Sequence, residues 1–283
     1  MNRRAFLRRT GAAAAVPAFA SATAAHGEST DSRPSNDGNG TAGDAGVSPA
    51  ATVMQGTEHA TPVYVNESGT DGPTALVVGG VHGDERPGYL AAERLRSRVP
   101  DAGTLVVLPR ANQVAIERDT REGKNGDLNR QFPPGKAPET ELAEEIWDFV
   151  RGTDPDVFVD LHRSVGIYRR HDASVGQAIF PAEVDDAPGV AEAVVDRLNS
   201  DAVPWYMPLH EFVRGNTITG EKPMLVHKVV GELDRPGYIV ETTRFLVDTE
   251  TQTKWLTEAA TALLARHGVD LSNGEEAATE GGS

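Results

Sequence analysis

The chain has 283 residues, of which 42 are Asp or Glu and 27 are Lys or Arg, so its formal net charge at pH 7 is −15. This excess of acidic residues argues against a general nucleic-acid binder, because binding phosphate groups requires clustered positive charge. The absence of cysteine excludes disulfide frameworks, thiol nucleophiles, cysteine zinc fingers and iron–sulfur clusters. The length suits one large domain or two modest ones.

The split among the basic residues indicates a salt-rich environment. Five of them are lysine and 22 are arginine. Many acids, few lysines and no cysteine are typical of proteins from salt-loving organisms, in which a high acidic charge keeps the protein soluble where salt screens repulsion. We favour this halophilic interpretation over that of an ordinary acidic secreted protein.

Residues 1–25 are predicted to be an export signal. Arg3 and Arg4 are followed by a phenylalanine and a leucine, a pattern that resembles the twin-arginine export motif. The apolar run at 11–20 is too short to act as a stop-transfer helix, and the Ala-Thr-Ala at 22–24 fits a cleavage site. We therefore expect the twin-arginine translocase as a partner, an extracellular or cell-surface location and no stable membrane anchor. The alternative is an amphipathic start to the fold.

Both ends of the remaining chain have the composition of disordered segments. Residues 26–56 are rich in small and polar residues and show no apolar periodicity, so they are predicted to be a disordered linker. Residues 272–283 have the same character and are predicted to be a disordered tail. The folded part is expected to be a single catalytic domain at 57–271.

Within that domain, short apolar runs alternate with segments of helical spacing. Strands are predicted at 74–80, 104–108, 156–161, 222–230 and 237–242, and helices at 85–98, 139–150, 187–200 and 249–267. Residues 111–138 are expected to form a long loop, and loops of this length are usually functional. The alternation predicts an α/β fold, a three-layer sandwich with a mostly parallel mixed sheet, in which sites lie beyond the C-terminal ends of the strands.

Three residues at predicted strand ends have the chemistry of a zinc site. His82 and Glu85 follow the first strand on a tight turn, and His162 closes the strand at 156–161. Two imidazoles and a carboxylate suit zinc and leave a fourth position open, as in catalytic zinc sites. A single strand-end histidine is more often a hydrogen-bonded surface residue. Three other histidines keep that interpretation: His171, His210 and His227.

Charged residues elsewhere indicate an anionic substrate. Asn129 and Arg130 are adjacent in the long loop and form a fork that can bind a carboxylate in bidentate fashion. The arginines at 163, 169 and 170 add positive charge in an acidic protein. The alternative for these arginines is simple solvation. Glu241 ends the strand at 237–242, which alone is a weak signal.

Taken together, these motifs resemble the zinc carboxypeptidase superfamily and, more closely, its succinylglutamate desuccinylase/aspartoacylase branch. The resemblance rests on Gly-Gly-Val-His-Gly-Asp-Glu at 79–85, on Asp-Leu-Asn-Arg at 127–130 with Phe-Pro at 132–133, on Asp-Leu-His at 160–162, and on Glu241. Their order matches that of the family, and they span nearly the whole predicted domain. The resemblance implies a zinc-carboxypeptidase-like fold.

The resemblance also assigns the metal and its closest partners. It implies that His82, Glu85 and His162 bind one zinc ion. Asp127 matches the aspartate that supports the first histidine ligand, and such a partner fixes the tautomer of the ring. Glu241 matches the catalytic glutamate that activates water and passes the proton to the leaving nitrogen.

The substrate-binding residues follow from the same resemblance. Asn129 and Arg130 match the pair that holds the carboxylate of the substrate. One further arginine should polarise the scissile carbonyl. Arg121 fits best, because Thr120 and Arg121 resemble the threonine–arginine pair of the family, and Arg118 is the alternative.

The implied function is that of an exported zinc hydrolase that cleaves an amide bond next to a carboxylate, as an N-acyl amino acid deacylase does. The substrate would be a small acyl-amino acid or a peptide with a free carboxylate. One alternative is a zinc carboxypeptidase that acts on extracellular peptides. The other is a non-catalytic metal- or anion-binding protein, which the presence of Glu241 disfavours because a binder needs no general base. The segment after Glu241 reads as one helix and a tail, so the C-terminal β domain common in the aspartoacylase branch is not expected.

Overall fold

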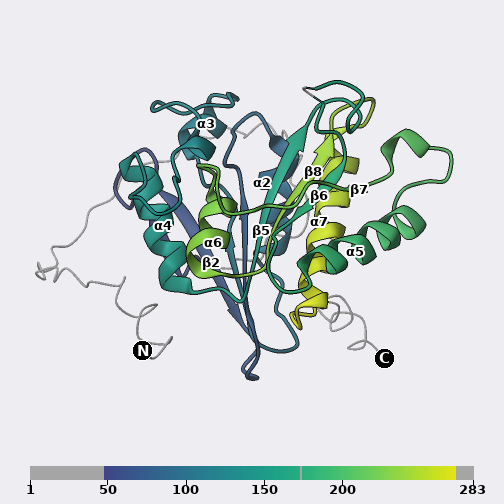
Figure 1. Cartoon of the computed structure of the whole chain (residues 1–283). Helices are drawn as coiled ribbons and strands as arrows, with labels where there is room; N and C mark the ends of the chain where they lie inside the picture. Colours follow the sequence, from purple (N-terminus) through teal and green to yellow (C-terminus); the bar gives the residue numbers. More distant parts are fainter. Residues whose placement is uncertain (1–47, 173, 272–283) are drawn as a thin grey trace, which may run out of the picture.

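An eight-stranded mixed sheet lies between two layers of helices in the computed structural model, which describes residues 48–172 and 174–271 (Figure 1). The expected export signal, most of the expected linker and the expected tail lie outside these residues. None of the described helices is long and apolar enough to cross a membrane.

The four central strands of the sheet are parallel. The strand order is β1-β2-β4-β3-β5-β8-β6-β7, and antiparallel pairing occurs at β1–β2, β2–β4 and β6–β8. The sheet is therefore mixed around a parallel centre, which confirms the predicted fold class. The strands are β1 (Ala51–Val53), β2 (Thr61–Glu67), β3 (Thr74–Gly79), β4 (Thr104–Leu108), β5 (Val157–Ser164), β6 (Ala178–Pro181), β7 (Val213–Arg214) and β8 (Gly237–Thr243).

Helices cover both faces of the sheet. One core contains α2 (Arg86–Leu95), α5 (Ala187–Asp201) and α7 (Thr249–Arg266), and the other contains α4 (Glu141–Thr153) and α6 (Leu225–Leu233). Alternate residues of β3 enter the two cores, because successive side chains of a strand point to opposite faces. Short helical turns occur in the connections: α3 (Gln113–Glu117), η1 (Leu128–Arg130) and η2 (Pro208–His210).

The strand predicted at 222–230 is wrong, because Leu225–Leu233 form helix α6. The apolar run is short, and a run of this length is compatible with either a strand or a buried helix. Leu225, Val226, Val229 and Val230 are all buried, and their spacing is that of one helical face against the sheet.

The boundary predicted between linker and domain at residue 57 is also wrong. Ala51–Val53 form strand β1, which pairs antiparallel with Thr61–Val63 of β2. Val53 and Met54 are buried in the core on the side of α4 and α6. The strand was missed because it is only three residues long, too short for periodicity to reveal.

A glycine-containing turn positions the first part of the site. Gly80, directly after β3, has a φ of +72°, which glycine adopts without strain. Gly88 lies in the first turn of α2, where an added Cβ would come within 2.4 Å of the carbonyl oxygen of Leu161. Helix α2 can therefore lie close against β5, and its start at Glu85 comes next to the end of that strand.

Candidate metal and catalytic site

His82, Glu85 and His162 form one buried cluster, in which one potential ligand atom of each lies within 4.8 Å of the others. The Nδ1 atoms of His82 and His162 lie 2.8 and 2.9 Å from the two carboxylate oxygens of Glu85. Glu85 is the N-cap residue of α2, yet its side chain makes no capping hydrogen bond and turns to the histidines instead. The turn after β3 and the end of β5 thus bring the three predicted ligands together.

A carboxylate lies against the other nitrogen of each ring. His82 Nε2 is 3.0 Å from Asp127 Oδ1, where the resemblance placed this partner. His162 Nε2 is 3.0 Å from Asp160 Oδ2, and Asp160 is fully buried. Asp127 is hydrogen-bonded to its ring, and such a partner orients the ring and raises its basicity. The Asp160 carboxylate lies at ion-pair distance from His162 Nε2, but their geometry is not that of a hydrogen bond. The role of Asp160 was missed in the sequence, although Asp160 and His162 are two residues apart on a strand and so point to the same face.

The charges of the cluster match those of a cation site. Burial disfavours the ionised form of Glu85, but His162 and His82 hold its pKa far below the usual range. Burial lowers the pKa of His162, but Asp160 and Glu85 raise it well above the usual value. Burial also opposes the charged form of Asp127, and His82 nevertheless lowers its pKa to about 2.

These shifts show that the cluster favours positive charge between its carboxylates. A divalent cation bound to two imidazoles and a carboxylate would supply that positive charge. The donor set is the one that zinc prefers. The buried residues therefore fit a single zinc ion.

Glu241 lies beside this cluster on the neighbouring strand. The parallel register of β5 and β8 pairs His162 with Glu241. The Oε2 atom of Glu241 is buried and has no hydrogen-bond partner among the described residues. Burial raises the pKa of Glu241 to about 8, with His162 opposing the shift and Glu85 reinforcing it. An unpartnered carboxylate with a pKa near neutrality has the property required of a general base.

A cavity of about 340 Å³ opens above these residues. Asn129 and Arg130, for which the sequence predicts carboxylate binding, line it. Asn129 Oδ1 accepts a hydrogen bond of 3.0 Å from the backbone NH of Leu225, at the start of α6. The Asn129 amide nitrogen is therefore the donor that remains for the cavity. Lining residues from β5, β8 and the segments around them complete the wall: Ser164, Val165, Val175, Met224, Ile239 and Arg244.

The structure separates the two candidates for the arginine that polarises the carbonyl. Arg121 lines the cavity and donates hydrogen bonds to Glu85 Oε1 at 2.9 Å and to Asp127 Oδ2 at 3.4 Å. Arg118 is the C-cap residue of α3, is exposed, and does not line the cavity. Arg121 is thus the candidate whose position suits the role.

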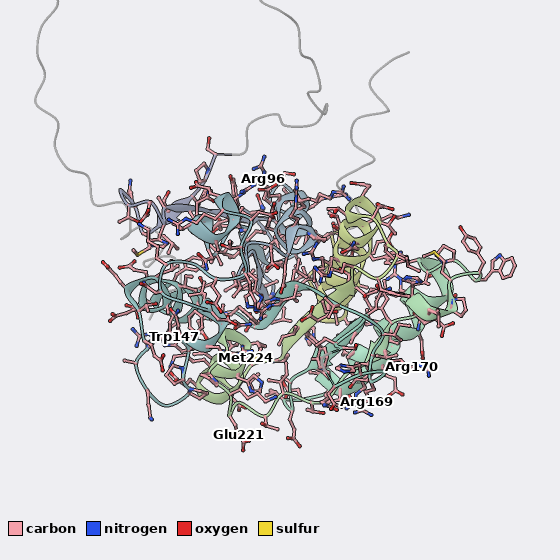
Figure 2. The ribbon with its side chains drawn as sticks, turned by 90° about the horizontal axis from the view of Figure 1, so that it is seen from above. Arg96, Trp147, Arg169, Arg170, Glu221 and Met224 are labelled. Atoms are coloured by element: carbon pink, nitrogen blue, oxygen red, sulfur yellow. The ribbon has the colours of Figure 1, made fainter. Side chains whose placement is uncertain are left out.

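Only one of the three arginines expected beside the site lines the cavity. Arg163 does so, and its backbone NH donates to Glu85 Oε2 at 2.9 Å. Arg169 instead donates to Asn216 Oδ1 at 2.6 Å, and Arg170 is exposed outside the cavity. Figure 2 shows both of these arginines toward the rim of the molecule, while Met224 lies nearer the centre.

The expectation of surface histidines holds only for His171, which is exposed. His210 is buried, with its Nε2 2.7 Å from the carbonyl oxygen of Phe245. His227 is also buried, and its Nδ1 accepts from the backbone NH of Lys222 at 3.3 Å. Neither belongs to the metal cluster. A lone histidine does not reveal its burial in the sequence, because burial depends on what packs against it.

Residues 71–167 match the family model described as succinylglutamate desuccinylase/aspartoacylase catalytic domain. This segment of the chain is therefore similar to the catalytic domain of the succinylglutamate desuccinylase/aspartoacylase family. The match contains His82, Glu85, Asp127, Asn129 and His162. Glu241 lies beyond the matched segment, so its assignment depends on its position beside His162.

A curated protein is similar to part of the chain. The chain is 40% identical over 109 residues to an N-alpha-acetyl-L-2,4-diaminobutyric acid deacetylase from Halomonas elongata, a match that covers 36% of this chain and 31% of the deacetylase. The chain thus spans less than a third of the length of that curated relative.

Solved structures share the fold. The product-bound cell shape determinant protein Csd4 from Helicobacter pylori superposes with a TM-score of 0.63 at 21% identity, covering 74% of this chain and 55% of Csd4. A succinylglutamate desuccinylase from Silicibacter sp. TM1040 gives a TM-score of 0.52 at 22% identity, and the match covers 74% of this chain and 61% of the desuccinylase. At these identities the likeness shows the fold alone.

Proposed function

We propose that this protein is a zinc-dependent hydrolase that cleaves an amide bond next to a carboxylate, of the N-acyl amino acid deacylase type. The observation that carries the proposal is the position of Glu241, in register with His162 and beside a buried cluster with the donor set of a zinc site. A protein that only bound metal would have no use for an unpartnered carboxylate at this position.

His82, Glu85 and His162 would hold the zinc ion, with Asp127 orienting the ring of His82 and Asp160 adding negative charge beside that of His162. The chemistry that zinc supplies when bound is Lewis acidity, which polarises a carbonyl and favours ionisation of water near neutral pH.

Glu241 acts as the base and then as the acid. Its carboxylate accepts a proton from the attacking water as the water oxygen bonds to the carbonyl carbon. The protonated Glu241 then gives this proton to the amide nitrogen as the carbon–nitrogen bond breaks. The products are a carboxylic acid and a free amine. A raised pKa suits both steps, because the group must take up a proton and release it at the same pH.

The remaining polar residues orient the substrate. The Asn129 amide and the Arg130 guanidinium bind the carboxylate next to the scissile bond. Arg121 contributes positive charge near the carbonyl oxygen, on the side of Glu85 and Asp127. The size of the cavity, about 340 Å³, is near the lower end for ligand sites and favours a small acyl-amino acid over a long peptide.

The test is a substrate panel with zinc-loaded protein in high salt, read by mass spectrometry of the products. The panel contains N-acetyl amino acids, with N-acetyl-2,4-diaminobutyrate among them, and dipeptides with a free C-terminus. We expect hydrolysis of at least one N-acyl amino acid and its loss in Glu241→Gln. Cleavage of dipeptides alone would favour the extracellular carboxypeptidase. Binding without any turnover would favour a non-catalytic metal- or anion-binding protein.

The composition and the N-terminal motif support two further proposals. We infer that the protein is exported by the twin-arginine translocase to the cell surface or beyond, which replacement of Arg3 and Arg4 by lysine should block. We also infer adaptation to high salt, so the melting temperature should fall as salt is removed and repulsion among the net −15 charge is less screened. Equal melting temperatures at low and molar salt would contradict the halophilic adaptation.

A further inference from the structure

We propose that Lys228 is a positioning residue that holds Asn129 and Arg130 in place for the carboxylate of the substrate. The inference rests on the proposed function and concerns the wall of the same cavity. Lys228 belongs to α6 and does not line that cavity, so it acts through the segment of chain that carries the pair.

Lys228 is buried in a chain that keeps its other lysines at the surface. Its side chain is 1% exposed, whereas the four other lysines, all of which the structure describes, are exposed. Removing an ammonium group from water is costly unless the group is paired and hydrogen-bonded. The buried Lys228 therefore needs an acceptor for each of its donors.

All three donors of the ammonium group have an acceptor. Nζ of Lys228 donates to the carbonyl oxygen of Pro133 at 3.0 Å, to that of Lys136 at 2.6 Å and to Glu232 Oε1 at 2.5 Å. The ring of Trp147 lies 4.9 Å from Nζ and adds a cation–π contact. Two of the three acceptors are backbone atoms of the segment after η1, so the ammonium group fixes the path of the chain there.

Glu232 extends this contact one turn further along α6. Its Oε1 also accepts a hydrogen bond of 2.8 Å from the backbone NH of Gly135. The Lys228–Glu232 pair therefore binds three backbone groups of residues 133–136, two carbonyls and one NH. The pair thus holds the backbone of this segment and not its side chains.

The start of α6 holds the carboxylate-binding pair itself. The Leu225 NH donates to Asn129 Oδ1 at 3.0 Å, and the NH of Phe132 donates to the carbonyl oxygen of Pro223 at 3.3 Å. Arg130 lies between these two contacts in the chain, and its Nη1 donates to the carbonyl oxygen of Asn129 at 2.8 Å. The segment is thus fastened to α6 on both sides of Arg130 and again further along the helix.

Helix α6 is a rigid support, because its buried face packs against β5 and β8 of the sheet. Without Lys228 the segment after Arg130 loses two backbone contacts, and the pair becomes free to take other orientations. Binding a carboxylate then costs more entropy. The bond-breaking step depends on Glu241 and the metal cluster, which Lys228 does not contact, so the effect falls on binding and not on the chemical step.

The experiment compares kcat and KM of the zinc-loaded full chain with those of Lys228→Met on the best N-acyl amino acid. Met keeps the length and the apolar stem of lysine but cannot donate a hydrogen bond. We expect KM to rise roughly tenfold and kcat to stay within about twofold of the wild type, because misplacing the pair weakens binding of the carboxylate. Lys254→Met is the matched control and should match the wild type, since Lys254 forms the same i,i+4 pair with Glu258 at an exposed position.

A binding measurement separates this inference from the proposed function. In the Glu241→Gln background, calorimetry with N-acetyl-L-alanine and with its amide, N-acetyl-L-alaninamide, needs no turnover. The dissociation constant of the acid should rise roughly tenfold when Lys228→Met is added, whereas that of the amide should not change. This result supports the inference even if the wild type hydrolyses no substrate of the panel.

Two results overturn the inference. One is an unchanged KM and an unchanged dissociation constant of the acid, with or without a fall in kcat, in a Lys228→Met protein of normal melting temperature. The other is equal affinity for the acid and the amide before Lys228 is replaced, because the pair then holds no carboxylate.

A second variant keeps the test decisive if Lys228→Met does not fold. The side chain of Glu232 is 28% exposed, and Glu232→Gln keeps its shape while removing the charge that pairs with Lys228. The dissociation constant of the acid should then rise by a smaller factor than in Lys228→Met. An unchanged value in Glu232→Gln overturns the inference as well.

Discussion

His162 and Glu241 occupy paired positions on adjacent parallel strands, where β5 and β8 reach the same edge of the sheet. In-register residues of parallel strands point to the same face, so the candidate base is adjacent to a candidate metal ligand. This adjacency comes from backbone pairing and does not depend on a flexible loop. The separation between base and metal cluster is thus fixed by the centre of the sheet.

Replacing Glu241 with Gln should therefore remove turnover and leave the metal site intact. Gln keeps the size of the side chain but cannot accept the proton, and losing a general base typically costs at least about 100-fold in rate. The measurements are kcat on the best N-acyl amino acid and zinc content by elemental analysis. Near-normal turnover would disprove the mechanism, and loss of zinc would make Glu241 a ligand.

Asp160→Asn should weaken zinc binding and preserve the fold. The substitution keeps the shape of the buried side chain but removes the negative charge 3.0 Å from His162 Nε2. Loss of such a partner typically lowers metal affinity by about 10- to 100-fold. Competition with a chromogenic chelator measures the affinity, and His162→Ala, which should lose stoichiometric zinc altogether, calibrates the assay. Unchanged affinity in Asp160→Asn would show that this carboxylate does not tune the ligand.

His227 should make the fold sensitive to mild acid. Burial, with a smaller contribution from Lys222, lowers its pKa to about 4 from an ordinary value of 6.5. The folded state thus prefers the neutral ring, whose Nδ1 accepts from the Lys222 NH. This stabilisation is present above pH 6.5 and is lost as the pH falls toward 4.

In His227→Gln the free energy of unfolding should depend less steeply on pH between 6.5 and 4. The difference should be roughly 1–2 kcal/mol, after allowance for partial solvation of the ring. Urea denaturation at several pH values measures it. His171→Gln, at an exposed histidine, is the control and should follow the wild type. Identical pH profiles for wild type and His227→Gln would refute the assignment.

Two truncations should differ in stability. Removing residues 1–56 deletes β1 and the buried Val53 and Met54, whereas removing residues 1–47 leaves them in place. Burying two such side chains contributes about 3–5 kcal/mol as an upper estimate, so the longer truncation should melt at a clearly lower temperature in high salt. Equal melting temperatures would show that β1 adds nothing to the fold.

The sequence was most informative where apolar runs were long and buried. The strand predicted at 104–108 is β4, with the same bounds, because a parallel strand covered on both faces is continuously apolar. Strands β2, β6 and β7 were missed. β2 is interrupted by polar residues, β6 is apolar but has only four residues and ends at a proline, and β7 has only two residues, so none of them carries a long apolar run.

The residues of the candidate site, like the strands, could be predicted from the sequence only in part. The three candidate ligands were found because each follows or ends a strand of the parallel centre, and these ends meet at one edge of the sheet. Asp160 could have been found from its spacing of two residues from His162. Arg244 could not, since its position depends on contacts with Ser164 and, through Phe245, with His210 that are distant in the chain.

The hydrogen bond from the Leu225 NH to Asn129 Oδ1 gives the cavity a built-in spectroscopic reporter. The amide proton at the start of α6 is bonded to a side chain whose other end faces the ligand. When an anion draws on the Asn129 amide nitrogen, the carbonyl oxygen of the same group becomes more electron-rich and the bond to Leu225 strengthens. The nitrogen-15 and proton resonances of Leu225 should therefore shift on titration with a carboxylate. This shift would report binding in the cavity without any need for turnover.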